Sequence, residues 1–418
     1  MPPIEKSKNQ NAKLLMLSVL LVVLLAALVT ACGNVNKKKS LDEYATRAMN
    51  QAQEAATSGT FGVGGILLDT DGNVICEMHN QVIKGNRIND PAAHGERQIV
   101  DWYLENKEKS GLPEPQDCIL ITTLDPCIMC TGALAQVKFN KVIVVALDDY
   151  AGINWKGDDD CSALAGTDCQ EYVKEHFAYP EVTGSLSRKA LGADVSNLNL
   201  FSDSTISSET LKGCQEAFSL TADDVRNRVS SISVELADIQ NPANLEPTHP
   251  IRKYLTESFG SDYLAFSWTP GDSAEALTDY IQKKHPGFQG VAYFDAFGNL
   301  LYLAEDDKNN PTQSAFMKVT RTLASARNTE PIEGYEINEY LHHPKYGYFV
   351  YTTCPDISAK TIMEIGAIGA TLETDSGHPI FYISGKENEN AVNAVIEKLP
   401  PLYNGVANIR FMQIPSGN

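Results

Sequence analysis

The chain has 418 residues, 43% of them hydrophobic and 21% charged, which is enough for two or three domains with cores of their own. Its formal net charge is −19. A protein that follows a nucleic-acid backbone normally presents a basic face, so this charge excludes a general phosphate-binding surface, and we do not expect nucleic acid as a partner.

Residues 1–32 have the pattern of a targeting segment. Three lysines make its start positive, Lys6, Lys8 and Lys13, and an uncharged, mostly apolar run follows over 14–31. The run ends in Val29-Thr30-Ala31-Cys32, which resembles a bacterial lipobox; the resemblance implies Cys32 as the lipidated first residue of the mature chain. The alternative is an uncleaved membrane anchor. Either way we expect the body outside the cytoplasm and tethered to a membrane, with 33–40 as a tether. The lipobox interpretation, which we adopt, makes it a lipid-anchored protein of the bacterial cell envelope.

The first predicted elements begin at residue 40. Ser40-Leu-Asp-Glu43 has the pattern of a capping box, which predicts a helix to about residue 56. The apolar stretch 61–68, the turn residues Asp69-Thr-Asp-Gly72 and a short apolar run from Val74 predict a β-hairpin.

A second group of elements follows. Residues 118–124 predict a buried strand, 129–137 a helix, and the β-branched run 141–147 a strand buried on both faces. Together with the first group, this order predicts a three-layer α/β/α sandwich with a mixed sheet over residues 41–200.

Between these elements lies a set of metal-binding residue types. His94 and Glu96 fall in the first turn of a predicted helix, and Cys127 and Cys130 frame the start of another. One imidazole and two thiolates can hold Zn²⁺ with the fourth position open for water, which is the pattern of a catalytic zinc site. Glu96 is two residues from a ligand, so it can reach that water and move its proton.

These motifs resemble the cytidine deaminase-like superfamily. Asp90-Pro-Ala-Ala-His-Gly-Glu96 and Thr123-Leu-Asp-Pro-Cys-Ile-Met-Cys-Thr-Gly-Ala-Leu134 look most like the branch of cytosine, guanine and tRNA-adenosine deaminases. The resemblance covers about residues 41–155 and departs at Gly95, where Ala is commoner. It implies the same sandwich fold, zinc at His94, Cys127 and Cys130, Glu96 as the proton shuttle, and Asn80 as a residue that bonds the substrate base. A turn residue is the alternative for Asn80.

The sequence beyond residue 147 is less informative. Acidic residues surround Tyr150 and Trp155 there, and this segment either shapes a base pocket, as in related deaminases, or is a solvated loop. Cys161 and Cys169 could form a disulfide in an oxidising compartment, which the sequence does not settle. We expect a linker and helical segment over 201–248.

The motifs of residues 249–418 partly repeat those of residues 41–200. Phe288 to Asn299 aligns with Phe61 to Asn73, and Asn310-Pro311 with Asp90-Pro91. In this alignment none of the zinc ligands or the glutamate has a chemically equivalent partner: Ser314 stands opposite His94, Phe316 opposite Glu96, Ile357 opposite Cys127 and Lys360 opposite Cys130. We therefore predict a degenerate deaminase-like domain without zinc, which could form an intrachain pseudo-dimer with the first. An unrelated α/β domain is the alternative.

The function predicted from the sequence is hydrolytic deamination of a nucleobase or small nucleoside-type substrate, with guanine or cytosine preferred. Two alternatives differ in class: a nucleic-acid or nucleotide deaminase of the effector type, which the acidic charge opposes, and a non-catalytic binding lipoprotein. Glu96 favours an enzyme, since a scaffold has no need of a proton shuttle beside a metal.

Overall fold

The computed structural model describes residues 38–85, 87–154, 161–183, 195, 198–231, 238–353, 355–372, 380–383, 388–404 and 411–413. Cys32 and the remainder of the targeting segment lie outside the described residues, as do Trp155 and 158–160. Ser40–Asn418 form one compact unit. Within it we call residues 40–231 the N-terminal lobe and residues 238–413 the C-terminal lobe. Among the described residues, no helix is both long and apolar enough to cross a bilayer.

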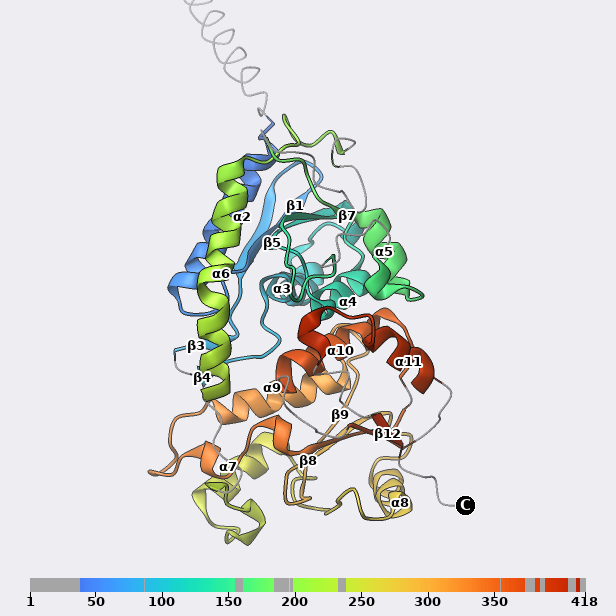
Figure 1. Cartoon of the computed structure of the whole chain (residues 1–418). Coiled ribbons are helices and arrows are strands. Elements are labelled where there is room, and N and C mark those ends of the chain that lie inside the picture. The colour runs from blue at the N-terminus through green and yellow to red at the C-terminus, as the bar shows by residue number, and fades with distance from the viewer. Residues whose placement is uncertain are drawn as a thin grey trace, which may run out of the picture. The chain divides into compact units, whose positions relative to one another are not determined.

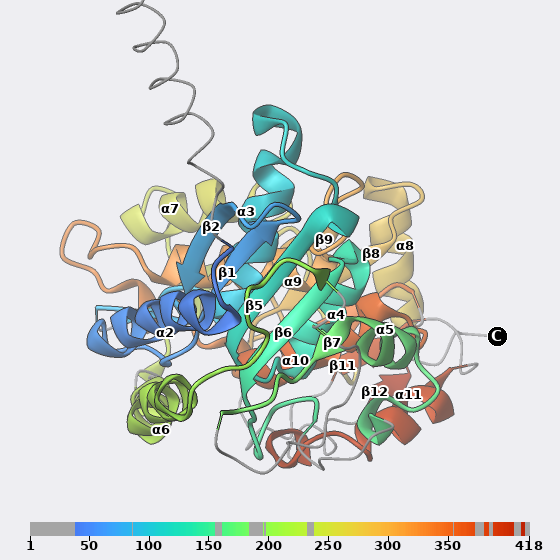
Figure 2. The same cartoon turned by 90° about the horizontal axis from the view of Figure 1, so that it is seen from above.

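The N-terminal lobe is built on a mixed five-stranded sheet in the order β2-β1-β5-β6-β7 (Figure 2). β1 is antiparallel to β2 and to β5, whereas β5, β6 and β7 run parallel. The strands are β1 (Gly64–Asp69), β2 (Val74–His79), β5 (Cys118–Leu124), β6 (Lys141–Ala146) and β7 (Phe177–Ala178). A two-stranded ribbon, β3 (Ile83–Lys84) with β4 (Arg87–Ile88), follows β2.

Helices cover both faces of this sheet. Ile119 and Ile121 of β5 pack toward α2 (Leu41–Thr57) and α6 (Ser208–Ser231), while Leu120 joins the core on the opposite face. This alternation follows from the two-residue period of a strand. The opposite face carries α3 (Gly95–Ser110), α4 (Ile128–Val137) and α5 (Asp168–His176). The N-terminal lobe thus has the mixed sheet with helices on both faces that the sequence predicts.

Local sequence explains where these helices begin and end. Ser40 and Glu43 form the predicted capping box, with Ser40 N–H donating to Glu43 Oε2 at 2.8 Å and Glu43 N–H donating to Ser40 Oγ at 3.2 Å. Gly111 ends α3 with φ of 60°, a conformation that glycine adopts readily. Helix α6, in the segment expected as linker and helix, packs against α2 and strands β5 and β6.

The C-terminal lobe holds a second mixed sheet, in the order β9-β8-β10-β11-β12. Its strand directions repeat those of the first sheet: the first three strands are antiparallel neighbours and the last three are parallel. The strands are β8 (Gly290–Phe294), β9 (Leu300–Glu305), β10 (Tyr348–Tyr351), β11 (Ile380–Tyr382) and β12 (Phe411–Gln413). The helices are α7 (Pro250–Phe259), α8 (Ala274–Lys284), α9 (Ala315–Arg327), α10 (Ala359–Leu372) and α11 (Glu389–Ile396).

The two hairpins match down to their turns. Asp69 Oδ1 accepts from Asn73 N–H at 2.8 Å and Asp69 Oδ2 from the Asn73 amide at 2.9 Å; Asp295 and Asn299 make the same two bonds, both at 2.8 Å. The glycines of the two turns have φ of 84° and 81°. Each hairpin also shifts register after its fourth strand residue, at Leu67/Leu68 and at Tyr293/Phe294. The second sheet therefore follows the hairpin alignment made from the sequence.

The alignment that we made near the cysteines is wrong. The predicted pairing of Cys127 with Ile357 places Thr123 opposite Thr353. In the structure Thr123 Oγ1 holds the backbone of Gly64, and it is Thr352 that holds the backbone of Gly290 in the same way. Met129 follows Thr123 by six residues, whereas Met363 follows Thr352 by eleven. A longer loop thus precedes α10 and displaces the pairing predicted for Ile357 and Lys360.

The contact between α4 and α10 gives the correct pairing. A Cβ placed on Gly132 would lie 2.4 Å from the Met363 backbone N, and one on Gly366 would lie 2.1 Å from the Met129 backbone N. Gly132 of α4 thus contacts Met363 of α10, and Gly366 of α10 contacts Met129 of α4. Such a reciprocal contact is expected across an interface with approximate two-fold symmetry. The positions equivalent to the cysteines are therefore Thr361 for Cys127 and Glu364 for Cys130.

The two lobes share one apolar core. It extends from the first sheet through α3 and α4 to α9, α10 and the second sheet, and Figure 1 shows α4 and α10 side by side between the sheets. A polar network accompanies it: the Arg321 guanidinium donates to Asp101 of α3 at 2.6 Å and lies 2.9 Å from Asp90. Arg97, which is fully buried, bonds Asp101 at 2.8 Å and the Thr312 carbonyl at 3.2 Å. Such an interface fixes the two lobes against one another.

Candidate metal centre and substrate cavity

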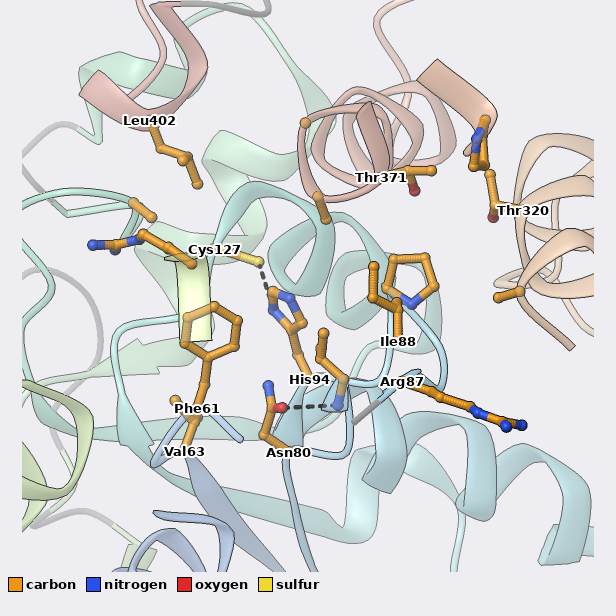
Figure 3. A pocket seen from close by; sticks show the side chains of 18 of the residues that line it. Phe61, Val63, Asn80, Arg87, Ile88, His94, Cys127, Thr320, Thr371 and Leu402 are labelled. Atoms are coloured by element: carbon orange, nitrogen blue, oxygen red, sulfur yellow. Dashed lines mark hydrogen bonds between the residues drawn. The ribbon is translucent and has the colours of Figure 1, made fainter. Parts of the chain in front are cut away.

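The three predicted metal ligands meet at the N-termini of two helices. His94 is the N-cap residue of α3, Cys127 is the N-cap residue of α4, and Cys130 lies one turn further along α4. Their ligand atoms all lie within 4.8 Å of one another, and Cys127 Sγ is 3.4 Å from His94 Nδ1 (Figure 3). Among the described residues this is the one group of three such side chains placed to hold an ion.

The arrangement fits zinc on both distance and donor chemistry. Tetrahedral bond lengths to sulfur and nitrogen place those two ligand atoms about 3.6 Å apart, close to the observed separation. The pKa of the Cys127 thiol lies well below its ordinary value because Cys130 donates a hydrogen bond to it and His94 adds positive charge. Helix N-termini further favour a thiolate. His94, Cys127 and Cys130 would thus hold zinc with one position left for water.

Glu96 is buried beside the ligands. Its side chain is 3% exposed, with Oε2 3.5 Å from Cys130 Sγ and Oε1 3.0 Å from the Thr122 hydroxyl. Burial raises the pKa of the carboxyl, and the Cys127 thiolate raises it further. A carboxylate so placed binds protons more readily than a solvated one, which suits a group that takes and returns a proton.

Asn80 lies in the same cavity with one end of its amide already engaged. Its Oδ1 accepts from the Thr60 hydroxyl at 2.6 Å and from the Val82 N–H at 3.0 Å. These donors fix the orientation of the amide. Among the described residues its NH₂ group makes no hydrogen bond, and the residue lines the cavity. Asn80 can therefore donate to an acceptor on a bound ring.

The cavity has a volume of about 530 Å³ and walls from both lobes. Figure 3 shows Phe61, Asn80 and His94 facing Thr320, Thr371 and Leu402 across it. The first three belong to the N-terminal lobe; the others come from α9, α10 and the 3₁₀ turn Pro401–Asn404. The lobe without zinc ligands thus supplies much of the wall.

Two functional candidates escaped the sequence reading. Tyr403 is buried and donates a hydrogen bond to Cys127; burial raises the pKa of its phenol well above the ordinary value, and the neighbouring Cys127 and Cys130 raise it further. Asp125 lines the cavity; burial raises its pKa to about 8, although the Tyr179 hydroxyl and the Asn154 N–H both donate to it at 2.7 Å. Asp125 lies between the buried strand and Cys127, a position that could have marked it. No sequence pattern around Tyr403 indicated a place beside the metal ligands.

The acidic segment after residue 147 contributes to the cavity. Asp148 and Tyr150 line it, and Asp148 is buried and accepts from the Tyr150 and Ala151 N–H groups. The pocket interpretation therefore applies to this described part of the segment. Cys161 and Cys169 are both buried free thiols in the structure.

An α/β domain with an N,S,S ligand set and a buried glutamate beside it defines the class of zinc-binding deaminase domains. Residues 38–146 match the family described as the cytidine and deoxycytidylate deaminase zinc-binding region. This part of the chain is accordingly a deaminase-family domain, and His94, Cys127 and Cys130 are its zinc-binding motif.

Curated relatives include three deaminases. The tRNA-specific adenosine deaminase of Aquifex aeolicus is 34% identical over 105 residues, 25% of this chain and 65% of that protein. The cytosine deaminase of Candida albicans is 31% identical over 97 residues, 23% of this chain and 60% of that protein. The guanine deaminase of Bacillus subtilis is 34% identical over 105 residues, 25% of this chain and 64% of that protein. The chain thus spans somewhat less than two thirds of each relative.

Proposed function

We propose that the protein is a zinc-dependent hydrolytic deaminase of a nucleobase or a small nucleoside-type substrate. The observation that carries the proposal is the placement of Glu96, a buried carboxyl beside the three ligand atoms and open to a cavity large enough for a heterocycle. In the overall reaction, water adds to the ring carbon that bears the amino group, the carbon–nitrogen bond breaks, and ammonia leaves.

The residues of the chain divide this work. His94, Cys127 and Cys130 would hold zinc, which when bound polarises water. Glu96 takes the two protons of the water in turn, delivering the first to the ring nitrogen and the second to the departing amine. Thr122 orients the carboxyl through its hydroxyl, 3.0 Å from Glu96 Oε1.

Asn80 is proposed to orient the ring. Its NH₂ group matches the carbonyl that guanine and cytosine both carry, one ring nitrogen away from the carbon under attack, and these two bases are the preferred substrates. Guanine and cytosine deaminases among the relatives support this preference.

The experiment compares wild type with Glu96→Gln. Zinc content and ammonia release are measured on one purified sample against a panel of bases, nucleosides and nucleotides. We expect Glu96→Gln to keep its zinc and to lose roughly 10²–10⁴-fold in kcat, the usual contribution of general acid–base catalysis. Zinc-loaded wild type without ammonia release from any member of the panel would oppose the proposal.

We further propose that the C-terminal lobe is a degenerate copy of the N-terminal lobe, standing in for a partner subunit. The repeated strand order, the matching hairpin turns and the reciprocal contact of α4 with α10 support this. A fragment of residues 40–231 should then be less stable and less active than the whole chain. A fragment equal to the whole chain on both measures would contradict the idea.

The location is a separate proposal that rests on the sequence. We propose that Cys32 is lipidated and tethers the chain to a membrane outside the cytoplasm of a bacterium. Expressed in a bacterial host, the wild type should incorporate labelled fatty acid and sediment with membranes. Cys32→Ser should do neither, and fatty-acid labelling that persists in this variant would count against the assignment.

A further inference from the structure

The cavity is larger than a free base requires. An engineered cavity of about 150 Å³ is enough to bind benzene. At about 530 Å³ the present cavity falls within the range of sites for drug-sized ligands. Space therefore remains after a ring is placed against Asn80 and the metal ligands, and much of its boundary belongs to the C-terminal lobe.

Arg327 lines this cavity from the end of α9. Its Nε is buried and has no hydrogen-bond partner, and no carboxylate of a described residue lies within ion-pair distance of its guanidinium. A partly buried guanidinium without an acidic partner is costly, because the lost hydration is not replaced. The cost is removed when an anion occupies the adjoining space.

The other two arginines of the cavity are already engaged. The Arg87 guanidinium donates to the carbonyls of Asn328 and Thr329 at 2.7 and 2.9 Å. Arg226 pairs with Asp223 at 3.3 Å and lies 4.5 Å above the Tyr150 ring. Arg327 thus differs from both, since among the described residues no carboxylate pairs with it, and the side chains that act on its charge are the phenols of Tyr293 and Tyr346.

Glu336, which also lines the cavity, does not change this conclusion. Its side chain is exposed to solvent and forms no ion pair with Arg327. The carboxyls nearer the metal ligands, Glu96, Asp125 and Asp148, are held by hydrogen bonds within the N-terminal lobe. No carboxylate that lines the cavity therefore takes the place of an anionic ligand at Arg327.

We propose that Arg327 is the anion-binding residue of the cavity, and that the substrate is a base derivative carrying a phosphate or carboxylate group. This inference rests on the proposed deamination and specifies its substrate class. The guanidinium presents a fork of donors that matches two oxygens of either group. The N-terminal lobe would read the ring and move the protons, while the C-terminal lobe would select substrates by charge.

The test measures binding in the Glu96→Gln background, where ligands are not consumed. Calorimetry on the zinc-loaded full chain compares cytosine, cytidine, cytidine 5′-monophosphate and 5-carboxycytosine, with the guanine series run alongside and inorganic phosphate as a minimal probe. We expect at least one anionic ligand to bind tenfold or more tightly than its neutral parent. The phosphate and carboxylate arms then show which group is preferred.

Variants assign that difference to Arg327. Arg327→Gln should remove the preference for the anionic ligand and leave the neutral parent unchanged, and Arg327→Lys should keep part of it. Lys318→Gln makes the same change of charge on the same helix but outside the cavity lining, so it should bind as the background does. If Arg327→Gln does not fold, Arg327→Lys and the ligand comparison in the background decide.

The outcomes separate the two proposals. Equal affinity for charged and neutral ligands, or an unchanged preference in Arg327→Gln, overturns the anion site while leaving deamination intact. Ammonia release from neutral bases alone in the wild type has the same meaning. Ligand binding with the expected charge preference but no ammonia release from wild type would support the anion site and remove the catalytic proposal.

Discussion

The two lobes have the same strand order but different chemistry at equivalent places. Where the N-terminal lobe bonds Glu96 to Thr122, the C-terminal lobe stacks Phe316 on Tyr351, with ring centroids 6.5 Å apart and planes at 10°. Four positions around the metal centre are replaced in the C-terminal lobe: His94 by Ser314, Glu96 by Phe316, Cys127 by Thr361 and Cys130 by Glu364.

Apart from Phe316, the replacing residues belong to a polar cluster, and no metal-binding set is found there among the described residues. Glu364 accepts from Ser314, while Lys360 is attracted to Glu364 and pairs with Asp306 at 2.5 Å. Asp306, which directly follows β9 as Asn80 follows β2, also accepts from the N–H of Ala315 at the start of α9. The comparison teaches that the second sheet has the same strand order while Ser314, Lys360 and Glu364 interact with one another where the first lobe has its metal ligands. The contact faces persist as well, as Gly132 and Gly366 show.

The largest contrast is expected when the equivalent residues Cys130 and Glu364 are each changed to serine. Cys130→Ser removes one of three ligands, so zinc and activity should both be lost, activity by roughly 10³-fold or more. Glu364→Ser should keep about one zinc per chain. Elemental analysis and ammonia release on both variants measure this, and zinc loss in Glu364→Ser would show that the lobes are not divided as described.

The glycines at the lobe contact should behave alike. Gly132→Ala and Gly366→Ala each place a methyl group against backbone of the facing helix, and each should lower the free energy of unfolding by about 3 kcal/mol, the upper end for overpacking. Gly271→Ala, where a Cβ meets nothing within 4 Å, is the matched control. Denaturant unfolding measures all three. A substitution tolerated on one helix only would break the two-fold description of the interface.

The smallest expected effect is a dependence of stability on pH. Burial raises the pKa of Glu364 from 4.5 to about 7, so the folded state holds its proton where the unfolded state has released it. This contribution is complete below about pH 4.5 and is lost as the pH rises through 7; between pH 5 and pH 8 it amounts to roughly 2 kcal/mol. Glu364→Gln cannot titrate and should reduce this slope in thermal unfolding. The same slope in both proteins would locate the titration elsewhere.

The metal centre was readable from sequence because its parts are local. His94 and Glu96 lie in one helical turn, Cys127 and Cys130 in another, and each motif fixes its own geometry. The repeated hairpin was readable for a similar reason, since Asp, Gly and Asn are required at fixed places in its turn.

The features that the sequence did not predict depend on packing between residues far apart in the chain. The loop before α10 is longer than the one before α4, and no residue type marks where its extra residues lie, so the pairing of Cys130 with Glu364 emerged only from the helix contact. Arg327 and Tyr403 belong to elements whose sequence shows ordinary helix and turn patterns. Their role comes from their position opposite the metal centre.

The contact between Tyr403 and Cys127 affects how the metal ligands become exposed to solvent. This residue contacts Cys127 from near the other end of the chain, so their contact closes a very long loop and is slow to form. The metal ligands, in contrast, are joined by short segments within one lobe. Local unfolding of the turn Pro401–Asn404 would therefore expose the ligands to solvent and chelators while the first sheet stays folded, and resistance to metal loss becomes a property of that turn.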